Sequence, residues 1–532
     1  MDRSEDARRL ASPSSSSSER TAASAPSSSD ASTRAEEHAT DGVKALDKLL
    51  QAQEGNALND NVKLVLTEAQ AWDKLGFTYP TWKKWTILSV IFAVQCSMNF
   101  NASVYANAVA PLSRQFDISE QAARVGQMIF LVAYAFGSEL WAPWSEELGR
   151  YPILQLSLFL VNIWQIPAAL APNFGTIVVA RFLGGICSAG GSVTLGMVAD
   201  MWKAEEQQFA VAFIVFSSVV GSVLGPVFGG LIEAHLSWHW NFWIQLIFGG
   251  VVQVIHFFLV PETSTRILLD REAKRRREAG EAEIYGPSEV EENRFSPRKI
   301  VIIWIRPFEM FVREPIVLFL SLLSGFSDSL IFTFLQGFDP VFKQWGFGTV
   351  AMGLAFISLL VGYIIAYASF MRRNPNSLLP EARLKWLLFT APLEPIGLFG
   401  FAWTSLGPAH GPWIAPMIFA AMIAIANYAI YMATIDYMIQ AYGPYAASAT
   451  GGNGFARDLL AGIAAMYSAP LYANLGRDSN EWASTLLGFL GILVVIPVYI
   501  FYKEGPAIRA RCKFAQEVAL RERESRPGTP ML

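Results

Sequence analysis

The chain has 532 residues, of which 52% are hydrophobic and only 16% are charged, and its mean hydropathy is +0.32. This apolar composition excludes a soluble enzyme of such length, and a net charge of −4 gives no indication of a nucleic-acid partner. Three cysteines are too few for a disulfide framework, the five histidines are scattered, and no glycine-rich nucleotide loop is present. We therefore expect a polytopic membrane protein that needs no metal and no cofactor.

Residues 1–80 precede the first apolar segment and are predominantly polar. Ser14 to Ser18 form an unbroken serine run, and the first ~40 residues cannot bury enough apolar surface to fold alone. We expect a disordered tail, with one or two short helices between residues 43 and 72. The serine run is either a phosphorylation target or a plain linker.

Twelve apolar segments long enough to cross a bilayer follow this tail. Six lie between residues 81 and 260, at 85–110, 124–144, 152–171, 175–200, 209–232 and 240–260. Six more lie between residues 315 and 502, at 315–337, 349–371, 385–404, 413–438, 446–470 and 482–502. This arrangement predicts an all-α membrane protein of twelve transmembrane helices in two six-helix halves, residues 81–260 and 315–502. A polar connection, residues 261–314, joins the halves, and residues 503–532 form a second tail.

Basic residues of the loops predict the orientation. The connection contains the run Lys274 to Arg277, and the loop after the eighth segment contains Arg372 and Arg373. The opposite loops contain only Arg114, Arg124, Lys343 and Arg477. This bias places both tails and the connection in the cytoplasm.

The fifth apolar segment reads Gly221-Ser-Val-Leu-Gly225-Pro226-Val-Phe-Gly229-Gly230. Glycine at every fourth position clears one helix face, so that a neighbouring helix can approach backbone to backbone. Pro226 removes one backbone hydrogen bond and bends the helix. Such a face suits a helix that rocks against a partner, and the alternative is a packing face with no role in transport.

Other segments carry a resemblance to a known family. Ala142-Pro-Trp-Ser-Glu-Glu-Leu-Gly149-Arg150, at the end of the second segment, resembles the loop signature of the major facilitator superfamily. Arg181-Phe-Leu-Gly-Gly185 is similar to the superfamily's R-x-x-x-G pattern, and the glycine segment resembles its antiporter motif. Pro261-Glu-Thr263, Arg306-Pro-Phe308 and Glu314-Pro-Ile-Val317 resemble the fungal drug:proton antiporters of the twelve-span branch, which include exporters of polyamines and secondary metabolites.

The chain departs from the family pattern at several charged positions. Ala142 replaces the first glycine of the loop signature, Glu147 its first arginine and Tyr151 its last basic residue. Gln208 and His239 stand where many relatives have arginine. These changes alter the charge balance of the predicted gate.

The resemblance implies a cytoplasmic gate formed by Glu146, Gly149, Arg150 and Asp200. An arginine flanked by carboxylates from two helices can form charge-assisted bonds across a moving contact, and in the family this contact latches the outward-open state. The alternative is a set of solvated loop charges that controls topology.

Proton coupling is expected at Arg181, Glu139, Asp328 and Glu394. A cation inside the fourth segment costs about 2.5–3.5 kcal/mol on insertion scales, so Arg181 should face the interior or a water-filled cavity. The resemblance implies that it takes part in coupling, and the alternative is a structural salt bridge. Buried carboxylates of an apolar bundle favour proton binding, which makes the three acidic residues candidates for proton exchange. The alternatives are that Glu139 simply lies near the cytoplasmic surface and that Asp328 and Glu394 are structural.

Uncharged polar side chains of the first and tenth segments are candidates to line a substrate cavity. They are Gln95, Asn99, Asn101, Asn427 and Tyr428. Together with aromatic side chains they would form a mostly apolar cavity with a few orienting contacts. The alternative is interhelical hydrogen bonding that only holds the bundle together.

We expect a transporter and not an enzyme, namely a proton-coupled exporter of amphipathic small organic molecules that works by alternating access. Its partners are the substrate, protons and the lipid bilayer, and a monomer is expected. The alternatives are a dedicated exporter of one self-made metabolite such as a glycolipid, a polyamine exporter, a proton-linked importer and a receptor that moves no solute. The intact glycine–proline motif disfavours import. The resemblance implies the plasma membrane, with the vacuolar membrane as the alternative.

Overall fold

The computed structural model is almost entirely helical in the part of the chain that it describes. The described residues are 64–188, 190–203, 206–280, 284–290, 297–372, 380–475 and 479–518. The chain divides into two units, Met1–Leu64 and Val65–Leu532, and every helix below belongs to the second unit. The predicted disorder of the serine-rich tail concerns residues that lie outside the described part.

The first half consists of six long helical segments, some of them made of consecutive shorter helices. These are α2 (Thr81–Val104) continued by η3 (Tyr105–Ala108) and α3 (Val109–Phe116), α5 (Val125–Leu148), α6 (Arg150–Ala169), α7 (Phe174–Ile186) followed by α8 (Gly190–Met201), α9 (Gln208–His235) and α10 (His239–Leu259). A short helix, α4 (Glu120–Ala123), precedes α5. Only Gly149 separates α5 from α6, and its φ of 105° is a backbone conformation that glycine adopts without strain.

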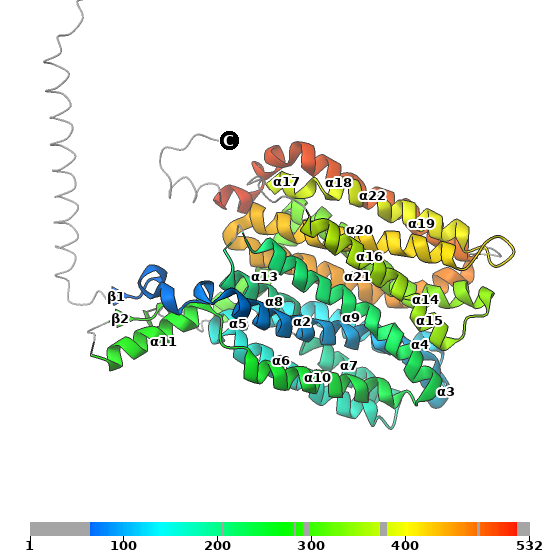
Figure 1. Cartoon of the computed structure of the whole chain (residues 1–532), viewed down its shortest axis with the longest axis horizontal. Coiled ribbons are helices and arrows are strands. Elements are labelled where there is room, and N and C mark those ends of the chain that lie inside the picture. Colours follow the sequence, from blue (N-terminus) through cyan, green and yellow to red (C-terminus); the bar gives the residue numbers. More distant parts are fainter. Residues whose placement is uncertain are drawn as a thin grey trace, which may run out of the picture. The chain divides into compact units, whose positions relative to one another are not determined.

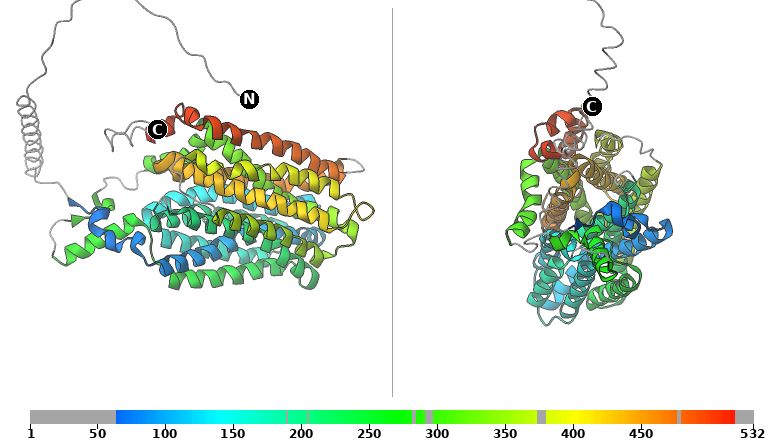
Figure 2. Two further views of the ribbon diagram at one scale, coloured as in Figure 1. Left: turned by 45° about the horizontal axis from the view of Figure 1, so that its top comes forward. Right: turned by 90° about the vertical axis from the view of Figure 1, so that its left-hand side faces the viewer.

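The second half repeats this arrangement. Its helices are α14 (Pro315–Phe342), α15 (Thr349–Ala355) with α16 (Ile357–Met371), α18 (Leu387–Thr390) with α19 (Leu393–Thr404), α20 (Ile414–Tyr442), α21 (Ala446–Asn474) and α22 (Ser479–Arg509). Short helices η4 (Lys343–Trp345), α17 (Pro380–Leu384) and η5 (Gly443–Tyr445) join them. In Figure 2 the helices of the first half run from blue to green, and those of the second half run from yellow-green to red.

Ten helices of the described residues are long and apolar enough to cross a membrane by length and composition. Two of the twelve predicted segments are not among these ten helices, and the structure shows why. Segment 175–200 is interrupted between α7 and α8, and α21 carries Asn453, Arg457 and Asp458, which lower its hydropathy. The prediction of an all-α, twelve-helix membrane fold is confirmed.

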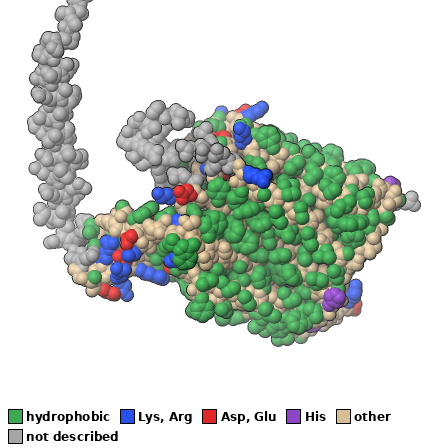
Figure 3. Space-filling model, viewed as in Figure 1, with side chains coloured by type: hydrophobic (Ala, Val, Ile, Leu, Met, Phe, Trp, Pro, Cys, Tyr) green, Lys and Arg blue, Asp and Glu red, His purple; other side chains and the backbone are tan. Residues whose placement is uncertain are grey.

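The two ends of the bundle differ in character. Figure 1 shows α11, β1 and β2 at one end, which we call the tail end, and α3, α4 and α15 at the other, which we call the far end. Hydrophobic side chains cover the flank of the bundle in Figure 3, whereas charged side chains gather at the tail end. This distribution is that of a protein whose flank contacts lipid and whose tail end contacts water.

The connection between the halves is largely helical. It contains α11 (Thr265–Glu278), β2 (Ile284–Tyr285), α12 (Pro287–Val290) and α13 (Pro297–Arg313). The segment before the first span supplies β1 (Leu64–Val65), which pairs with β2, and the short helices η1 (Glu68–Lys74) and η2 (Gly76–Thr78). Leu269 and Ala273, one helical turn apart on α11, pack against Leu66, Ala71 and Leu75. This apolar contact explains why a segment of polar composition folds at the tail end.

The C-terminal segment beyond α22 packs against a buried carboxylate. Glu314, which precedes α14, is fully buried and accepts hydrogen bonds from the Phe514 backbone N–H (3.0 Å) and from the Tyr442 hydroxyl (3.2 Å). Cys512 is buried beside it, and burial together with the Glu314 carboxylate raises the pKa of the Cys512 thiol to about 12. Glu314 thus anchors the start of the second tail.

We expect Cys512 to react slowly with maleimide at pH 7.5, because the thiolate is the reactive form and is scarce far below the thiol pKa. Glu314→Gln removes the adjacent charge and weakens the anchor, so the alkylation rate of Cys512 should rise. Peptide mass spectrometry after timed alkylation measures this rate for each cysteine separately, and buried Cys96 serves as the internal control. An unchanged rate in the variant would show that Glu314 does not hold the segment.

Candidate functional site

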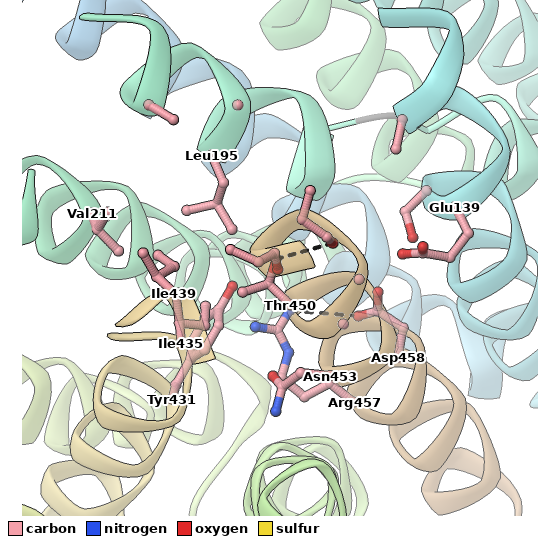
Figure 4. Close-up of a pocket in the computed structure, with 18 of the residues that line it drawn as sticks. Glu139, Leu195, Val211, Tyr431, Ile435, Ile439, Thr450, Asn453, Arg457 and Asp458 are labelled. Carbon is pink, nitrogen blue, oxygen red and sulfur yellow. Dashed lines mark hydrogen bonds and ion pairs between the residues drawn. The ribbon is translucent and has the colours of Figure 1, made fainter. Parts of the chain in front are cut away.

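A cavity of about 190 Å³ lies between the two halves, on the tail-end side of the bundle (Figure 4). Its lining comes from α5, α8, α9 and the first residue of α6 in the first half and from α20 and α21 of the second. Along α5 the lining runs from Tyr134 to Glu146, a rise of about 18 Å. The volume is smaller than the ~300 Å³ at which pockets for organic ligands begin, so the halves are close together in this conformation.

Glu139 of α5 faces α21 of the other half. Its side chain is buried, and a Cβ atom on Gly451 would lie 2.5 Å from its Oε2. A glycine at this position of α21 therefore allows the carboxylate to lie directly against the opposite helix. Figure 4 shows Glu139 and Asp458 pointing toward one another from α5 and α21.

Arg457 lies at the centre of a charged cluster within the second half. Its Nε is 3.9 Å from Asp328 Oδ2, and its Nη2 is 3.7 Å from Asp458 Oδ1. Its guanidinium lies over the Tyr431 ring, 3.8 Å from the ring centroid. An arginine held between two carboxylates and an aromatic face is stabilised in a low-dielectric environment. Asp458 was not among the residues predicted for proton coupling, because adjacency to Arg457 on a helix says nothing about what lies opposite.

Arg181 lies elsewhere, near the far end of the first half. It is almost fully buried and donates from Nη1 to Asn101 Oδ1 (2.7 Å) and from Nε to the Gly126 carbonyl (3.3 Å). Its guanidinium stacks 3.9 Å from the centroid of the Phe130 ring. Gly126 precedes Glu139 by about 20 Å along α5, so Arg181 and Glu139 belong to different sites. No carboxylate pairs with Arg181 among the described residues.

Glu394 is fully buried in α19 and does not line the cavity. It lies beside Ser327 of α14, whose hydroxyl accepts from Asn427 Nδ2 at 3.2 Å. Asn427 in turn accepts from the Tyr363 hydroxyl at 3.1 Å. Glu394 and the predicted cavity residue Asn427 therefore share a polar cluster inside the second half.

The other predicted cavity residues also lie outside this lining. Asn99 Nδ2 donates to the Gln95 carbonyl (2.9 Å) within α2, and Asn101 binds Arg181. The Tyr428 hydroxyl donates to the Ala212 carbonyl at 2.9 Å, which joins α20 to α9 across the halves. The Asn101 and Tyr428 contacts are of the interhelical kind that holds a bundle together, whereas the Asn99 bond stays within α2.

Three of the four predicted gate residues meet at the tail end of the first half. Arg150 donates from Nε to Asp200 Oδ2 (3.1 Å), and a Cβ on Gly196 would lie 2.6 Å from its guanidinium carbon. Gly149 provides the turn that directs Arg150 toward α8. Glu146 is exposed and lines the cavity instead of pairing with Arg150.

Glu262 contacts the predicted gate residue Arg150. It is buried at the start of the connection and accepts hydrogen bonds from the backbone N–H groups of Arg150 (2.9 Å) and Tyr151 (3.3 Å), which open α6. It also accepts from Thr263 and Ser264 N–H at 2.9 Å. A carboxylate is well placed at a helix N-terminus because the free N–H groups there carry partial positive charge. The Pro261-Glu-Thr263 segment was noticed only as a family resemblance, and its role depends on a tertiary contact.

Glu147, a departure from the loop signature, has a structural partner. Its Oε1 lies 2.7 Å from Arg266 Nη1, which connects α5 to α11. Gln208, another departure, accepts from Arg383 Nη1 at 2.7 Å, and Arg383 lies 3.4 Å from Asp436. The chain therefore places its own charge pairs around the tail end.

We expect Glu262→Gln to lower the free energy of unfolding by about 1.5–3 kcal/mol, the range for hydrogen bonds to a charged group. The amide retains one acceptor oxygen and loses the charge that favours the α6 N-terminus. Thermal melting of the purified protein in detergent checks this, with exposed Glu278→Gln on α11 as the matched control. Equal melting temperatures for Glu262→Gln and the control would contradict the assignment.

The glycine segment of α9 has two packing faces. Gly221 and Gly225 lie against α2 of the same half, where a Cβ on Gly221 would be 2.8 Å from Asn99 Cβ, and Gly229 lies against Asn107 of η3. A Cβ on Gly230 would instead lie 2.7 Å from the Thr349 carbonyl oxygen in α15 of the other half. From the opposite side, a Cβ on Gly353 would lie 2.6 Å from the carbonyl oxygen of Pro226. The motif therefore joins α9 to α2 within one half and brings the halves together near the far end.

Polar contacts close the far end beside this helix crossing. Arg124 Nε donates to Gln336 Oε1 at 3.1 Å, and Gln121 Nε2 donates to the Met466 carbonyl at 2.7 Å. Both bonds join the first half to the second. The halves are therefore in contact at the far end, and the bond from Arg383 to Gln208 also joins them at the tail end, toward which the cavity lies.

Two six-helix halves with a charged cavity between them are the architecture of a membrane transport protein. Sequence comparison gives the family. The pattern of the Major Facilitator Superfamily matches residues 91–466. The transporter paaT of Penicillium rubens is 30% identical over 498 residues, which are 89% of this chain and 90% of that protein.

A Monascus ruber protein, the citrinin biosynthesis cluster MFS transporter mrr1, is 30% identical over 467 residues, covering 84% of this chain and 92% of that protein. The xylose transporter XylE of E. coli, in a partially occluded inward open conformation, has the same fold with a TM-score of 0.59. It is 17% identical and covers 79% of this chain and 98% of that one. The chain belongs to the Major Facilitator Superfamily. It is a multi-pass membrane transporter of small organic molecules and not an enzyme.

Proposed function

We propose that this protein exports a small organic secondary metabolite in exchange for protons. The observation that carries the proposal is the position of Glu139, which is buried between the halves and faces Asp458 across the cavity. Two ionised carboxylates repel strongly in a low-dielectric cavity, and a proton on one of them removes this repulsion. Proton binding would therefore change how favourably α5 and α21 pack, and this packing couples the proton to the movement of the halves.

The relatives support the substrate class. A relative of this chain is named for the biosynthesis cluster of citrinin, which is a small organic metabolite. Three carboxylates line the cavity, those of Glu139, Glu146 and Asp458, and the guanidinium groups of Arg457 and Arg150 balance them in part. A polyamine carries several positive charges, which the small excess of carboxylates over arginines would not neutralise, so this lining favours neutral or amphipathic molecules over polycations.

Orientation follows from the placement of basic residues. The tail end carries Arg266, Arg383 and the run Lys274 to Arg277, whereas Arg114, Arg124 and Lys343 belong to the far end. By the positive-inside rule the tail end faces the cytoplasm, with both termini on that side. Arg373 and Arg477, which entered the same argument, lie outside the described residues. We assign the plasma membrane as the site of export.

The gate and the glycine motif complete the proposed cycle. Arg150 and Asp200, supported by Glu262, form the cytoplasmic latch of the first half. Gly230 and Gly353 form the close contact that seals the far end while the cavity faces the cytoplasm. Separation of this contact opens the cavity to the outside, as alternating access requires.

Uptake into sealed proteoliposomes containing the purified full chain tests the proposal, with and without an imposed proton gradient. The substrate panel contains a fluorescent lipophilic dye, spermidine and a metabolite extract of the source organism. We expect gradient-dependent accumulation of one metabolite or a small group of related metabolites. Accumulation of many unrelated compounds would instead indicate broad drug efflux, and accumulation of spermidine alone would indicate polyamine export. Equal uptake with and without the proton gradient would exclude proton coupling.

A further inference from the structure

A second cavity, of about 680 Å³, lies at the tail end of the second half, between the start of α14 and the end of α22. It is separate from the central cavity, and the two share no lining residue. Phe319 and Ile500, which line it, are 43% and 46% exposed in the protein without lipid. The cavity therefore opens on the outer surface of the bundle.

Its lining is divided into an apolar wall and a basic rim. The wall consists of side chains of α14 and α22, among them Phe319, Ile500 and Phe501. The rim consists of Arg313, at the end of α13, with Arg511 and Lys513, which follow α22. No acidic residue is among those that line this cavity.

The rim lies at the level where the bundle passes from lipid to water. Along α22 the exposed apolar side chains end with Ile500 and Tyr502, and Arg511 follows within about three helical turns. The exposed apolar surface of α22 continues from this level into the middle of the helix, where Leu493 is 66% exposed. Phosphate groups of a cytoplasmic leaflet occupy this boundary, and basic pockets between transmembrane helices bind anionic headgroups there.

We propose that this cavity binds one anionic phospholipid of the surrounding leaflet. The lipid phosphate contacts Arg313, Arg511 and Lys513, and an acyl chain lies along Phe319 and Ile500. Arg313 also pairs with Glu309 at 2.5 Å, and its guanidinium has five donors, so donors remain for a phosphate. The basic rim complements the charge of the headgroup, and the apolar wall is open to the bilayer. The wall distinguishes this site from a site for a soluble anion, which has no acyl chain to contact it.

The site joins three segments that are distant in the sequence. Arg313 belongs to the connection between the halves, Phe319 to α14, and Arg511 and Lys513 to the start of the second tail. The Phe514 N–H that follows is bound to buried Glu314. A bound phospholipid therefore stabilises the docked position of this tail on the second half.

Native mass spectrometry of the full chain in detergent tests the proposal, with phosphatidylserine, phosphatidylcholine and inorganic phosphate titrated separately. We expect phosphatidylserine to bind at one site in preference to phosphatidylcholine, and inorganic phosphate not to compete at equal concentration. The double variant Arg511→Gln/Lys513→Gln should weaken phosphatidylserine binding about 30-fold, because each cation near the surface contributes about 1 kcal/mol. The matched control is Lys503→Gln, an exposed cation of α22 outside the cavity.

Several results would overturn the proposal. Equal binding of the two lipids would remove the role of the basic rim, and full competition by inorganic phosphate would assign the rim to a soluble anion. Unchanged binding in the double variant, or an equal loss in Lys503→Gln, would place the lipid elsewhere. If the double variant does not yield monodisperse protein, Arg511→Gln alone decides, with an expected loss of about fivefold.

Discussion

Replacing Glu139 by glutamine should reduce proton-driven accumulation of substrate to the level measured without a gradient. The variant keeps the size of the side chain and its position against Gly451, but it cannot exchange a proton. Removal of the charge also ends the repulsion between Glu139 and Asp458 across the cavity. Substrate exchange between the two sides in the absence of a gradient should persist, because the moving helices remain intact.

Two measurements on the same proteoliposomes check this expectation, namely accumulation under a proton gradient and counterflow of labelled substrate without one. Glu504→Gln, an exposed carboxylate of α22, is the matched control and should behave as the wild type. Glu394→Gln tests the competing carboxylate, which the structure places outside the cavity. Gradient-driven accumulation that survives in Glu139→Gln and disappears in Glu394→Gln would move the coupling site into the second half.

The second large effect is expected at the glycine motif. Gly230→Val places a side chain against the Thr349 carbonyl of the other half, where a Cβ alone would already approach to 2.7 Å. Overpacking of this kind costs about 1–3 kcal/mol, and here it acts only on the conformation in which the far end is closed. The equilibrium between the two conformations should therefore shift about 5–150-fold toward the one with an open far end. Transport should fall because the protein cannot readily return to the conformation with a closed far end.

Distances between spin labels at exposed Asp117 and Lys343, one in each half at the far end, report this shift directly. They should lengthen in Gly230→Val and remain as in the wild type in Gly250→Val, because a Cβ on Gly250 has no atom within 4 Å.

Gly225→Val provides the contrasting case, since this glycine packs against Ser103 of α2 in the same half. It should lower thermal stability without changing the preference between conformations. Unchanged label distances in Gly230→Val would show that this contact does not control the far end.

Much of the architecture could be predicted because it follows from local patterns in the sequence. Long apolar segments, their separation by a charged connection and the glycine face of residues 221–230 are all properties of neighbouring residues. The predicted segments therefore coincide with the helices, with ends that differ by only a few residues because helix ends depend on caps and local turns. The helix α11 of the connection was missed, because its apolar side is short and is buried by contact with residues 66–77.

The candidate site could be predicted only in part. Glu139, Asp328 and Arg150 were found because a charge inside or beside an apolar segment is unusual and costly without a partner. Their partners could not be found in this way. Asp458 faces a residue more than 300 positions earlier in the chain, and no local rule relates two such positions.

The amino-acid sequence by itself determined the class of this protein, its helices and the residues that are too polar to face lipid, because burial of apolar surface depends on composition and periodicity. Only the tertiary structure decided which of those polar residues work together. In the structure Arg181 and Glu139 lie in different sites, Glu394 lies outside the cavity and Glu262 lies at the α6 N-terminus. The physical reason is that hydrogen bonds and ion pairs act over a few ångströms, so their partners are determined by how whole helices pack and not by distance along the chain.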